Sequence, residues 1–324
     1  MTGVGDWATR ARTVRPGPLA LGERLGYALL MRVLVTGASG FVGRHLLASL
    51  PSTVAVHTLS RTGRPGRSHH RADVSDPVEV RSVLSAVRPD VVVHLAAIAQ
   101  VRAHTAAHVQ AVNVDGARHV AEALWRVRPE ARLVAVSTGY VHGETVEPAA
   151  EDAPLAPVGP YATSKARMEG VLGRVSRGRS LCIVRPFNHV GPGQPEDYAV
   201  PAFVRKVRAV VSGGADRLVV GDLTAERDLA DVRDLAAGLA SLVTMPEVPP
   251  VLQICSGRAV PMRVVLHHIV QLAGLDPRRV TIESRGHSAL RRNVGLPTRA
   301  HQLGIRSRPL AHTLADVWAS AQEA

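Results

Sequence analysis

Tyr161 and Lys165 are the residues of this chain whose spacing most clearly predicts chemistry. They stand four apart in Tyr-Ala-Thr-Ser-Lys, at the start of a stretch with amphipathic helical spacing, so they share one helix face. A free phenol titrates near about 10, and a nearby ammonium group favours the phenolate and lowers that pKa. The alternative is a chance tyrosine beside a solvated lysine, but the 39 basic residues include only two lysines, Lys165 and Lys206. The pair therefore predicts a phenol that exchanges protons.

A second group of residues could hold a phosphate. The apolar, strand-like run at 32–36 is followed by Gly37, Gly40 and Gly43, and then by residues with helical apolar spacing. Gly37 permits a tight turn, Gly40 lets the backbone approach a pyrophosphate, and Gly43 lets the helix pack closely on its strand. The spacing is G-x-x-G-x-x-G and not G-x-G-x-x-G, and a simple turn is the alternative. The strand before and the helix after favour dinucleotide binding.

The two motifs together, Thr-Gly-Ala-Ser-Gly-Phe-Val-Gly at 36–43 and Tyr-x-x-x-Lys at 161–165, resemble the extended short-chain dehydrogenase/reductase superfamily of NAD-dependent epimerases and dehydratases. The resemblance runs from about Met31 to the C-terminus. It implies an α/β fold, a Rossmann-type doubly wound parallel sheet with a smaller C-terminal α/β substrate lobe. Residues 31–185 are then mainly the NADP-binding domain and 186–324 mainly the substrate-binding lobe, with Val251–Ser256 returning to the large sheet. Residues 1–30 are expected to be a disordered extension.

The expected second strand ends at Ser60 and Arg61, where an acidic residue would accept hydrogen bonds from the ribose hydroxyls of NAD. Arg61, with Arg64 and Arg67 nearby, can pair with a 2′-phosphate, so NADP(H) is favoured over NAD(H). A basic solvated loop is the alternative. The segment around Asp73 resembles the adenine-binding segment of the superfamily. The residues expected at the cofactor are Gly37, Ser39, Gly40, Phe41, Val42, Gly43, Ser60, Arg61, Asp73, Val74, Leu95, Ala96, Ala97, Tyr161, Lys165 and Pro186.

The resemblance implies a third catalytic residue, Thr138. In the extended enzymes the strand before the Tyr-x-x-x-Lys helix is followed by a turn that ends in a glycine, here Gly143. A Ser or Thr five residues before that glycine hydrogen-bonds the reacting oxygen. Sugar-nucleotide 4,6-dehydratases carry an acidic residue in the next two positions, which are Gly139 and Tyr140 here, so a dehydratase is disfavoured. Asn113, on a long helix expected from about Thr105 to Val127, is implied to support the active site from behind, although a solvated asparagine is the commoner case. The expected catalytic residues are Thr138, Tyr161 and Lys165.

The segment Arg185–Gln194, Arg-Pro-Phe-Asn-His-Val-Gly-Pro-Gly-Gln, is rich in Pro and Gly and is expected to be a loop. It resembles most closely the GDP-4-keto-6-deoxymannose reductases, which implies that Asn188 holds the substrate; a turn capped by that Asn is the alternative. Arg227 is implied to clamp a diphosphate with its guanidinium fork. The segment 283–293 departs from the family pattern, which leaves the nucleobase open. The residues expected at the substrate are Thr138, Asn188, Val200, Arg205, Gly221, Arg227 and Arg285.

The resulting hypothesis is an NADPH-dependent reductase of a nucleotide-linked 4-keto-6-deoxy sugar in deoxysugar biosynthesis, with a GDP-linked sugar favoured. An epimerase that retains NAD(P) uses the same residues, so the motifs do not separate the two. A dinucleotide-binding protein without turnover is a second alternative. The superfamily often pairs through two helices, which correspond to 105–127 and 162–175 here, so the resemblance favours a homodimer.

Composition excludes several other classes. The formal charge is +12, but the arginines are scattered and aromatic residues make up only 3 %, so no stacking platform for nucleic acid is expected. No apolar run approaches the roughly 18 residues of a membrane span. Cys182 and Cys255 lie in apolar runs, outside any metal-ligand spacing, so we expect no metal site and a reducing, cytoplasmic location.

Overall fold

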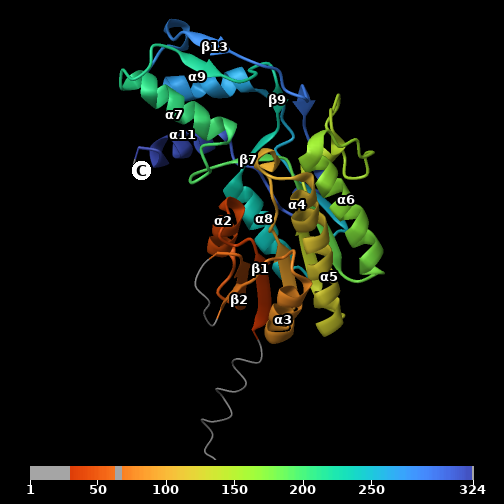
Figure 1. Ribbon diagram of the computed structural model, residues 1–324. Helices are drawn as coiled ribbons and strands as arrows, with labels where there is room; N and C mark the ends of the chain where they lie inside the picture. Colours follow the sequence, from red (N-terminus) through yellow and green to blue (C-terminus); the bar gives the residue numbers. More distant parts are fainter. Residues whose placement is uncertain (1–29, 63–67, 323–324) are drawn as a thin grey trace, which may run out of the picture.

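The protein, described here from a computed structural model for residues 30–62 and 68–322, is built on one seven-stranded parallel sheet (Figure 1). The strand order is β11-β6-β5-β4-β1-β2-β3, so the chain runs outward from β1 in both directions. This confirms the predicted doubly wound sheet, whose switch point lies between β1 and β4. The strands are β1 (Met31–Thr36), β2 (Val54–Ser60), β3 (His69–Arg71), β4 (Val91–His94), β5 (Arg132–Val136), β6 (Leu181–Pro186) and β11 (Val251–Ile254).

Helices cover both faces of this sheet. Successive residues of β1 alternate between two cores: Leu34 packs with α3, α5 and α6, whereas Val33 and Val35 pack with α2 and α8. Because neither face meets water, the strands are nearly continuous apolar runs. The helices are α2 (Phe41–Ser49), α3 (Pro77–Val87), α5 (Gly116–Val127), α6 (Gly159–Ser176) and α8 (Val232–Thr244).

A smaller part of the chain lies above the carboxyl ends of the large sheet (Figure 1). It has a core of its own around Phe203, Leu218 and Leu266. Short strands pair β7 with β10, β8 with β13, and β9 with both β12 and β14. Its elements are β7 (Asn188–Val190), α7 (Ala199–Val211), β8 (Leu218–Val220), β9 (Glu226–Arg227), β10 (Leu229–Asp231), β12 (Val260–Pro261), α9 (Met262–Leu272), β13 (Ile282–Ser284), β14 (Arg292–Asn293) and α11 (Leu310–Ser320). The helix α10 (Thr298–Gln302) instead packs against β11 of the large sheet.

Two expected elements differ from those observed. The long helix expected from 105 to 127 consists of α4 (Ala106–Gln110), one π-helical turn η2 (Ala111–Asp115) and α5, and the wider turn directs Asn113 into the interior. The expected loop 185–194 contains the strand β7, because Asn188–Val190 pairs in parallel with Leu229–Asp231. The predictions for residues 1–29 and for Arg64 and Arg67 lie outside the described residues.

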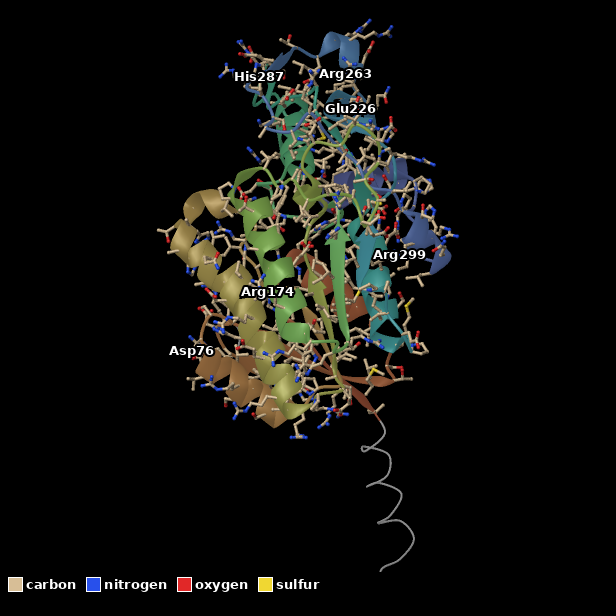
Figure 2. All side chains as sticks on the ribbon, turned by 90° about the vertical axis from the view of Figure 1, so that its right-hand side faces the viewer. Asp76, Arg174, Glu226, Arg263, His287 and Arg299 are labelled. Atoms are coloured by element: carbon tan, nitrogen blue, oxygen red, sulfur yellow. The ribbon has the colours of Figure 1, made fainter. Side chains whose placement is uncertain are left out.

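The basic residues are distributed over the molecule. Figure 2 labels Arg174 on α6, Arg263 on α9 and Arg299 on α10, well apart from one another. In the part of the chain that is described, no helix combines the length and the apolar character that a membrane crossing needs.

Candidate active site

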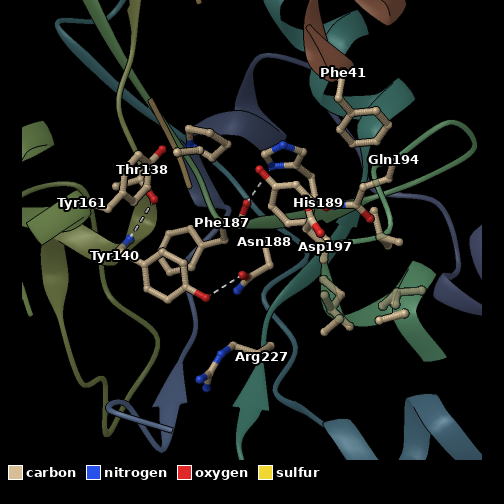
Figure 3. A pocket seen from close by; sticks show the side chains of 18 of the residues that line it. Phe41, Thr138, Tyr140, Tyr161, Phe187, Asn188, His189, Gln194, Asp197 and Arg227 are labelled. Carbon is tan, nitrogen blue, oxygen red and sulfur yellow. Dashed lines mark hydrogen bonds between the residues drawn. The ribbon is translucent and has the colours of Figure 1, made fainter. Parts of the chain in front are cut away.

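A cavity of about 970 Å³ lies between the carboxyl ends of the large sheet and the smaller part of the chain (Figure 3). Its walls come from the start of α2, the ends of β4, β5 and β6, the first turns of α6, and the region from β7 to β9. Most of the expected site residues meet there. They are Gly37, Gly40, Phe41, Val42, Gly43, Leu95, Ala97, Thr138, Tyr161, Lys165, Pro186, Asn188, Val200, Gly221, Arg227 and Arg285.

The glycine turn is a cradle that side chains would fill. Gly37 has φ +70°, and a Cβ there would lie 2.7 Å from the amide nitrogen of Ala96. A Cβ on Gly43 would lie 2.5 Å from the carbonyl oxygen of Gly37. The turn leads into α2, whose N-cap is Gly40 with no side-chain cap, so the first amides of the helix are available to an anion. This geometry fits the pyrophosphate of a dinucleotide.

The remaining expected cofactor residues do not line the cavity. Ser39 is exposed in the glycine turn, and Ala96 packs behind it against Gly37. Parallel pairing of β1, β2 and β3 brings the others to the same edge of the sheet. There the Ser60 hydroxyl donates to the Thr62 carbonyl. The residues concerned are Ser39, Ser60, Arg61, Asp73, Val74 and Ala96.

Arg61 follows β2 and Asp73 follows β3 at this edge, close enough for the charge of Arg61 to act on the Asp73 carboxyl. Burial opposes ionisation of Asp73, but hydrogen bonds from Ser75 and the charge of Arg61 keep the pKa of this carboxyl below its usual value. Arg61 itself is exposed. The edge therefore presents a guanidinium to solvent where an NAD-binding chain would present a carboxylate.

Thr138, Tyr161 and Lys165 are brought together by β5 and α6. Thr138 follows β5 and caps the short helix η3 (Gly139–His142), accepting from the amide of Tyr140 at 3.3 Å. Thr138 and Tyr161 lie beside one another in Figure 3. Lys165, only 2 % exposed, donates from Nζ to the Val136 carbonyl at 2.7 Å. The arrangement places two hydroxyl groups and a buried ammonium at one end of the cavity.

The electrostatics differ from the expectation that Lys165 acidifies the phenol. Burial raises the pKa of Tyr161, with a hydrogen bond from Thr138 opposing the rise. Burial also lowers the pKa of Lys165 to about 8, and the charge of Glu169 opposes this fall. For the protein alone the predicted acidification is wrong, because burial raises the pKa of Tyr161 and the Lys165 ammonium is directed at the Val136 carbonyl.

Asn113 contacts α6 from the side away from the cavity. It is fully buried, and its Oδ1 accepts from the amide of Ile98 at 2.7 Å. Its Nδ2 donates to the Ile98 carbonyl and to the Ser164 hydroxyl, both at 3.0 Å. The amide thus joins the segment after β4 to α6 between Tyr161 and Lys165.

Asn188 and Arg227 reach the cavity from the opposite wall. The Tyr140 hydroxyl donates to Asn188 Oδ1 at 2.7 Å, and Asn188 Nδ2 is buried without a partner among the described residues (Figure 3). Arg227 donates to the carbonyls of Glu226 at 2.8 Å and Leu290 at 2.9 Å. Arg285 is exposed and forms an ion pair with a neighbouring carboxylate. This wall of the cavity therefore carries one amide nitrogen without a partner among the described residues and two guanidinium groups.

The segment after β7 is tied to the start of α2. The rings of Phe41 and His189 stack with centroids 6.0 Å apart. Arg44 donates to the Gly193 carbonyl at 3.1 Å, and a ring nitrogen of His45 lies 3.0 Å from the carbonyl oxygen of Pro192. The helix of the glycine turn and the segment 189–193 are thus in direct contact.

The sequence profile of the NAD dependent epimerase/dehydratase family matches residues 33–255. The chain belongs to this family. Among its relatives, the GDP-6-deoxy-D-mannose reductase of Pseudomonas aeruginosa is 30% identical over 283 residues, which cover 84% of this chain and 90% of that protein.

Solved structures of the NAD dependent epimerase/dehydratase family share the fold. The Pseudomonas aeruginosa protein RMD, solved with NADPH, superposes with a TM-score of 0.79 at 27% identity, covering 90% of this chain and 99% of that one. The UDP-glucose 4-epimerase of Thermus thermophilus, solved with NAD, has a TM-score of 0.79 at 26% identity, covering 91% and 100%. Family membership and the glycine cradle make this chain an NAD(P)-dependent enzyme.

For this epimerase/dehydratase-family enzyme, Arg205 is the expected substrate residue that lies apart from the cavity. It forms an ion pair with Glu196 at 3.1 Å and lines a separate depression of about 430 Å³ with Arg208. Lys206 lines the main cavity instead and donates to the Val219 carbonyl. Successive helical residues point about 100° apart, so Arg205 and Lys206 lie on different surfaces of α7.

Sequence reasoning also assigned no role to several lining residues, namely Tyr140, Phe187, His189, Asp197, Tyr198, Asp222 and Ser288. A compositional signal could have found two of them, Tyr140 and Tyr198. The chain has four tyrosines, and Tyr140, Tyr161 and Tyr198 line the cavity, as do both of its lysines. In a chain this poor in both residue types, such a concentration indicates a site.

Proposed function

We propose that this chain is an NADPH-dependent reductase of a nucleotide-linked 4-keto-6-deoxy sugar, with a GDP-linked sugar favoured. The observation that carries the proposal is one cavity shared by the glycine cradle, the group Thr138, Tyr161 and Lys165, and the basic residues Lys206 and Arg227. The similarity to a GDP-6-deoxy-D-mannose reductase over most of both chains supports the substrate class. In this proposal residues 31–185 mainly hold the dinucleotide and residues 186–324 mainly hold the sugar nucleotide.

When bound, a nicotinamide dinucleotide supplies a hydride to the carbonyl carbon of the sugar. Negative charge then develops on the carbonyl oxygen, and Thr138 donates a hydrogen bond that stabilises it. Tyr161 gives its proton to the same oxygen as general acid. Lys165, whose pKa is about 8, stabilises the phenolate that remains on Tyr161.

The opposite wall binds the nucleotide portion. Asn188 Nδ2 offers a buried donor without a partner among the described residues, so a phosphate or sugar oxygen can accept from it. Lys206 and Arg227 line the cavity and would place positive charge beside a diphosphate.

The position after Thr138 supports reduction over dehydration. A Cβ on Gly139 would lie 2.6 Å from the ring of Phe187, so an acidic side chain does not fit there unless Phe187 moves. The next residue is Tyr140, whose hydroxyl donates a hydrogen bond to Asn188 Oδ1. No carboxylate from either position can therefore exchange protons with the sugar.

The test is an incubation of the purified protein with GDP-4-keto-6-deoxymannose and NADPH, followed at the nicotinamide absorbance band. We expect NADPH to be consumed in a one-to-one ratio with the reduced sugar. Isomerised sugar without net NADPH loss would identify an epimerase, and the absence of turnover across GDP-, dTDP- and UDP-linked sugars would favour a non-catalytic binder. Either result would overturn the reductase proposal.

The preference for NADPH rests on Arg61, which is exposed at the end of β2. Replacing Arg61 with serine is expected to raise the KM for NADPH about tenfold or more, because a charged hydrogen bond to the 2′-phosphate is lost, and to leave the KM for NADH unchanged. The matched control is Arg81→Ser, at an exposed arginine on α3. Equal effects on NADPH and NADH would contradict the preference.

A homodimer through helices 105–127 and 162–175 stays a prediction from the resemblance, and a cytoplasmic location stays a prediction from the two cysteines. Light scattering of the purified protein measures the assembly directly.

A further inference from the structure

A buried ion pair lies behind the catalytic residues, outside the cavity. Glu169 on α6 and Arg185 on β6 approach to 2.7 Å between Oε2 and Nη2, with side chains only 8% and 6% exposed. Nε of Arg185 also donates to both carboxylate oxygens, at 3.1 and 3.2 Å. Neither residue lines the cavity. A pair of this kind is costly to desolvate, and apolar residues of similar volume could pack the same space.

One end of the pair contacts the segment that leads to Thr138. Glu169 stands one helical turn after Lys165, on the same face of α6. The Ser137 hydroxyl donates to Glu169 Oε1, and Ser137 immediately precedes Thr138. Lys165 Nζ also donates to the Val136 carbonyl, so two hydrogen bonds from neighbouring residues join the segment 136–138 to α6.

The other end of the pair is held by neutral partners. Arg185 Nη1 donates to the Glu151 carbonyl at 2.8 Å and lies 3.3 Å from His142 Nε2. Gln253 Nε2 approaches the same ring nitrogen at 3.2 Å. Two donors aimed at Nε2 require it to accept, so His142 is neutral, in keeping with the lowering of its pKa by burial and by Arg185.

The charges around Lys165 are unequal. Glu169 supplies a negative charge from α6, and Arg185 lies beyond it on β6. His94 at the end of β4 is neutral, since burial lowers its pKa to about 3, and Tyr161 one turn earlier carries no charge at neutral pH because burial raises its pKa. Glu169 is thus the group that opposes the burial of the ammonium.

We propose that Glu169 is a positioning residue whose carboxylate keeps Lys165 charged and, through Ser137, fixes Thr138 beside Tyr161. Its role in turnover rests on the proposed function, whereas its effect on the charge of Lys165 does not. Arg185 anchors the carboxylate and limits its movement toward the lysine.

The first test is a titration of Lys165 that needs no activity. Because the chain has only two lysines, protein made with lysine labelled at the side-chain nitrogen gives two side-chain NMR signals, and Lys165→Met assigns them. In Glu169→Gln the titration midpoint of Lys165 is expected to fall by about one pH unit or more, because burial is no longer opposed and the charge of Arg185 is no longer balanced. An unchanged midpoint overturns the proposal.

The double variant Glu169→Gln with Arg185→Met removes both charges and covers the case in which the single variant does not fold. Its midpoint is expected between those of the single variant and the parent, since the nearer of two opposite charges dominates. A merely structural role predicts that neither variant moves the midpoint, even if stability falls. A midpoint equal to that of the parent in the double variant also contradicts the proposal.

The second test is the pH profile of kcat in the sugar reduction assay. Activity that needs the ammonium is lost above the pKa of Lys165, so the alkaline limb is expected to move to lower pH in Glu169→Gln. If no sugar nucleotide is reduced but the NMR midpoint moves, the proposed function fails and the role of Glu169 stands. If the sugar nucleotide is reduced but Glu169→Gln shifts neither the alkaline limb of the kcat profile nor the NMR midpoint of Lys165, the proposed function stands and the role of Glu169 fails.

Discussion

Replacing Lys165 with methionine is expected to lower kcat by about 10²- to 10⁴-fold while the protein stays folded. The ammonium group is buried, donates to the Val136 carbonyl and lies one turn from Tyr161, so its loss removes the charge that stabilises the phenolate. Methionine has a similar length and suits a buried site better than an uncompensated charge. Turnover is measured with saturating NADPH, and folding by circular dichroism.

Lys206→Met is the matched control, because Lys206 is the other lysine of the chain and lines the same cavity at the nucleotide end. Here the KM for the sugar nucleotide is expected to rise with little change in kcat, since the charge acts on binding and not on the reacting oxygen. Normal turnover in Lys165→Met would remove Lys165 from the mechanism, and equal losses of kcat in both variants would point to general disruption.

Asp228→Ala is expected to lower the free energy of unfolding by about 3 to 5 kcal/mol. The carboxylate is fully buried and accepts from the amide and hydroxyl of Ser256 at 2.7 and 2.6 Å. Its second oxygen accepts from the amides of Gly257 at 2.9 Å and Gly295 at 3.3 Å. Alanine leaves three buried backbone donors unpaired, in segments that join β9, β11 and β14. Urea unfolding measures the loss.

Asp222→Ala provides the comparison. Asp222 also accepts several hydrogen bonds, from the amide and hydroxyl of Thr224 and the amide of Ser288, but its side chain is less buried. Water can replace it, so a loss of only about 1 kcal/mol is expected. Equal losses in the two variants would show that burial is not the reason for the role of Asp228.

The features that could be predicted from the sequence are those set by local pattern. An Asp followed by Pro is a local signal for a helix start, and α3 begins at Pro77 with Asp76 accepting from the amide of Val78 at 2.7 Å. The apolar run starting at Val251 was expected in the large sheet and pairs there with β6. In these segments capping and apolar spacing agree with the tertiary contacts.

The features that could not be predicted depend on distant partners. Strand β7 exists because the chain returns at Leu229–Asp231 to pair with it. The π-helical turn is matched to the contacts of Asn113 with Ile98 and Ser164, which no local pattern specifies. The spacing of Tyr161 and Lys165 gave their shared face, but the direction of both pKa changes is decided by burial.

The start of α2 contacts the segment 189–193 through Phe41 with His189 and through Arg44 with Gly193. These contacts imply that the dinucleotide and the sugar nucleotide bind cooperatively. Whichever ligand arrives first restricts the motion of both segments, so the second loses less conformational entropy on binding. This coupling is reciprocal: each ligand raises the affinity for the other by the same factor. Saturation by one ligand should therefore lower the apparent Kd of the other, and oxidised dinucleotide should leave more readily once the sugar product has gone.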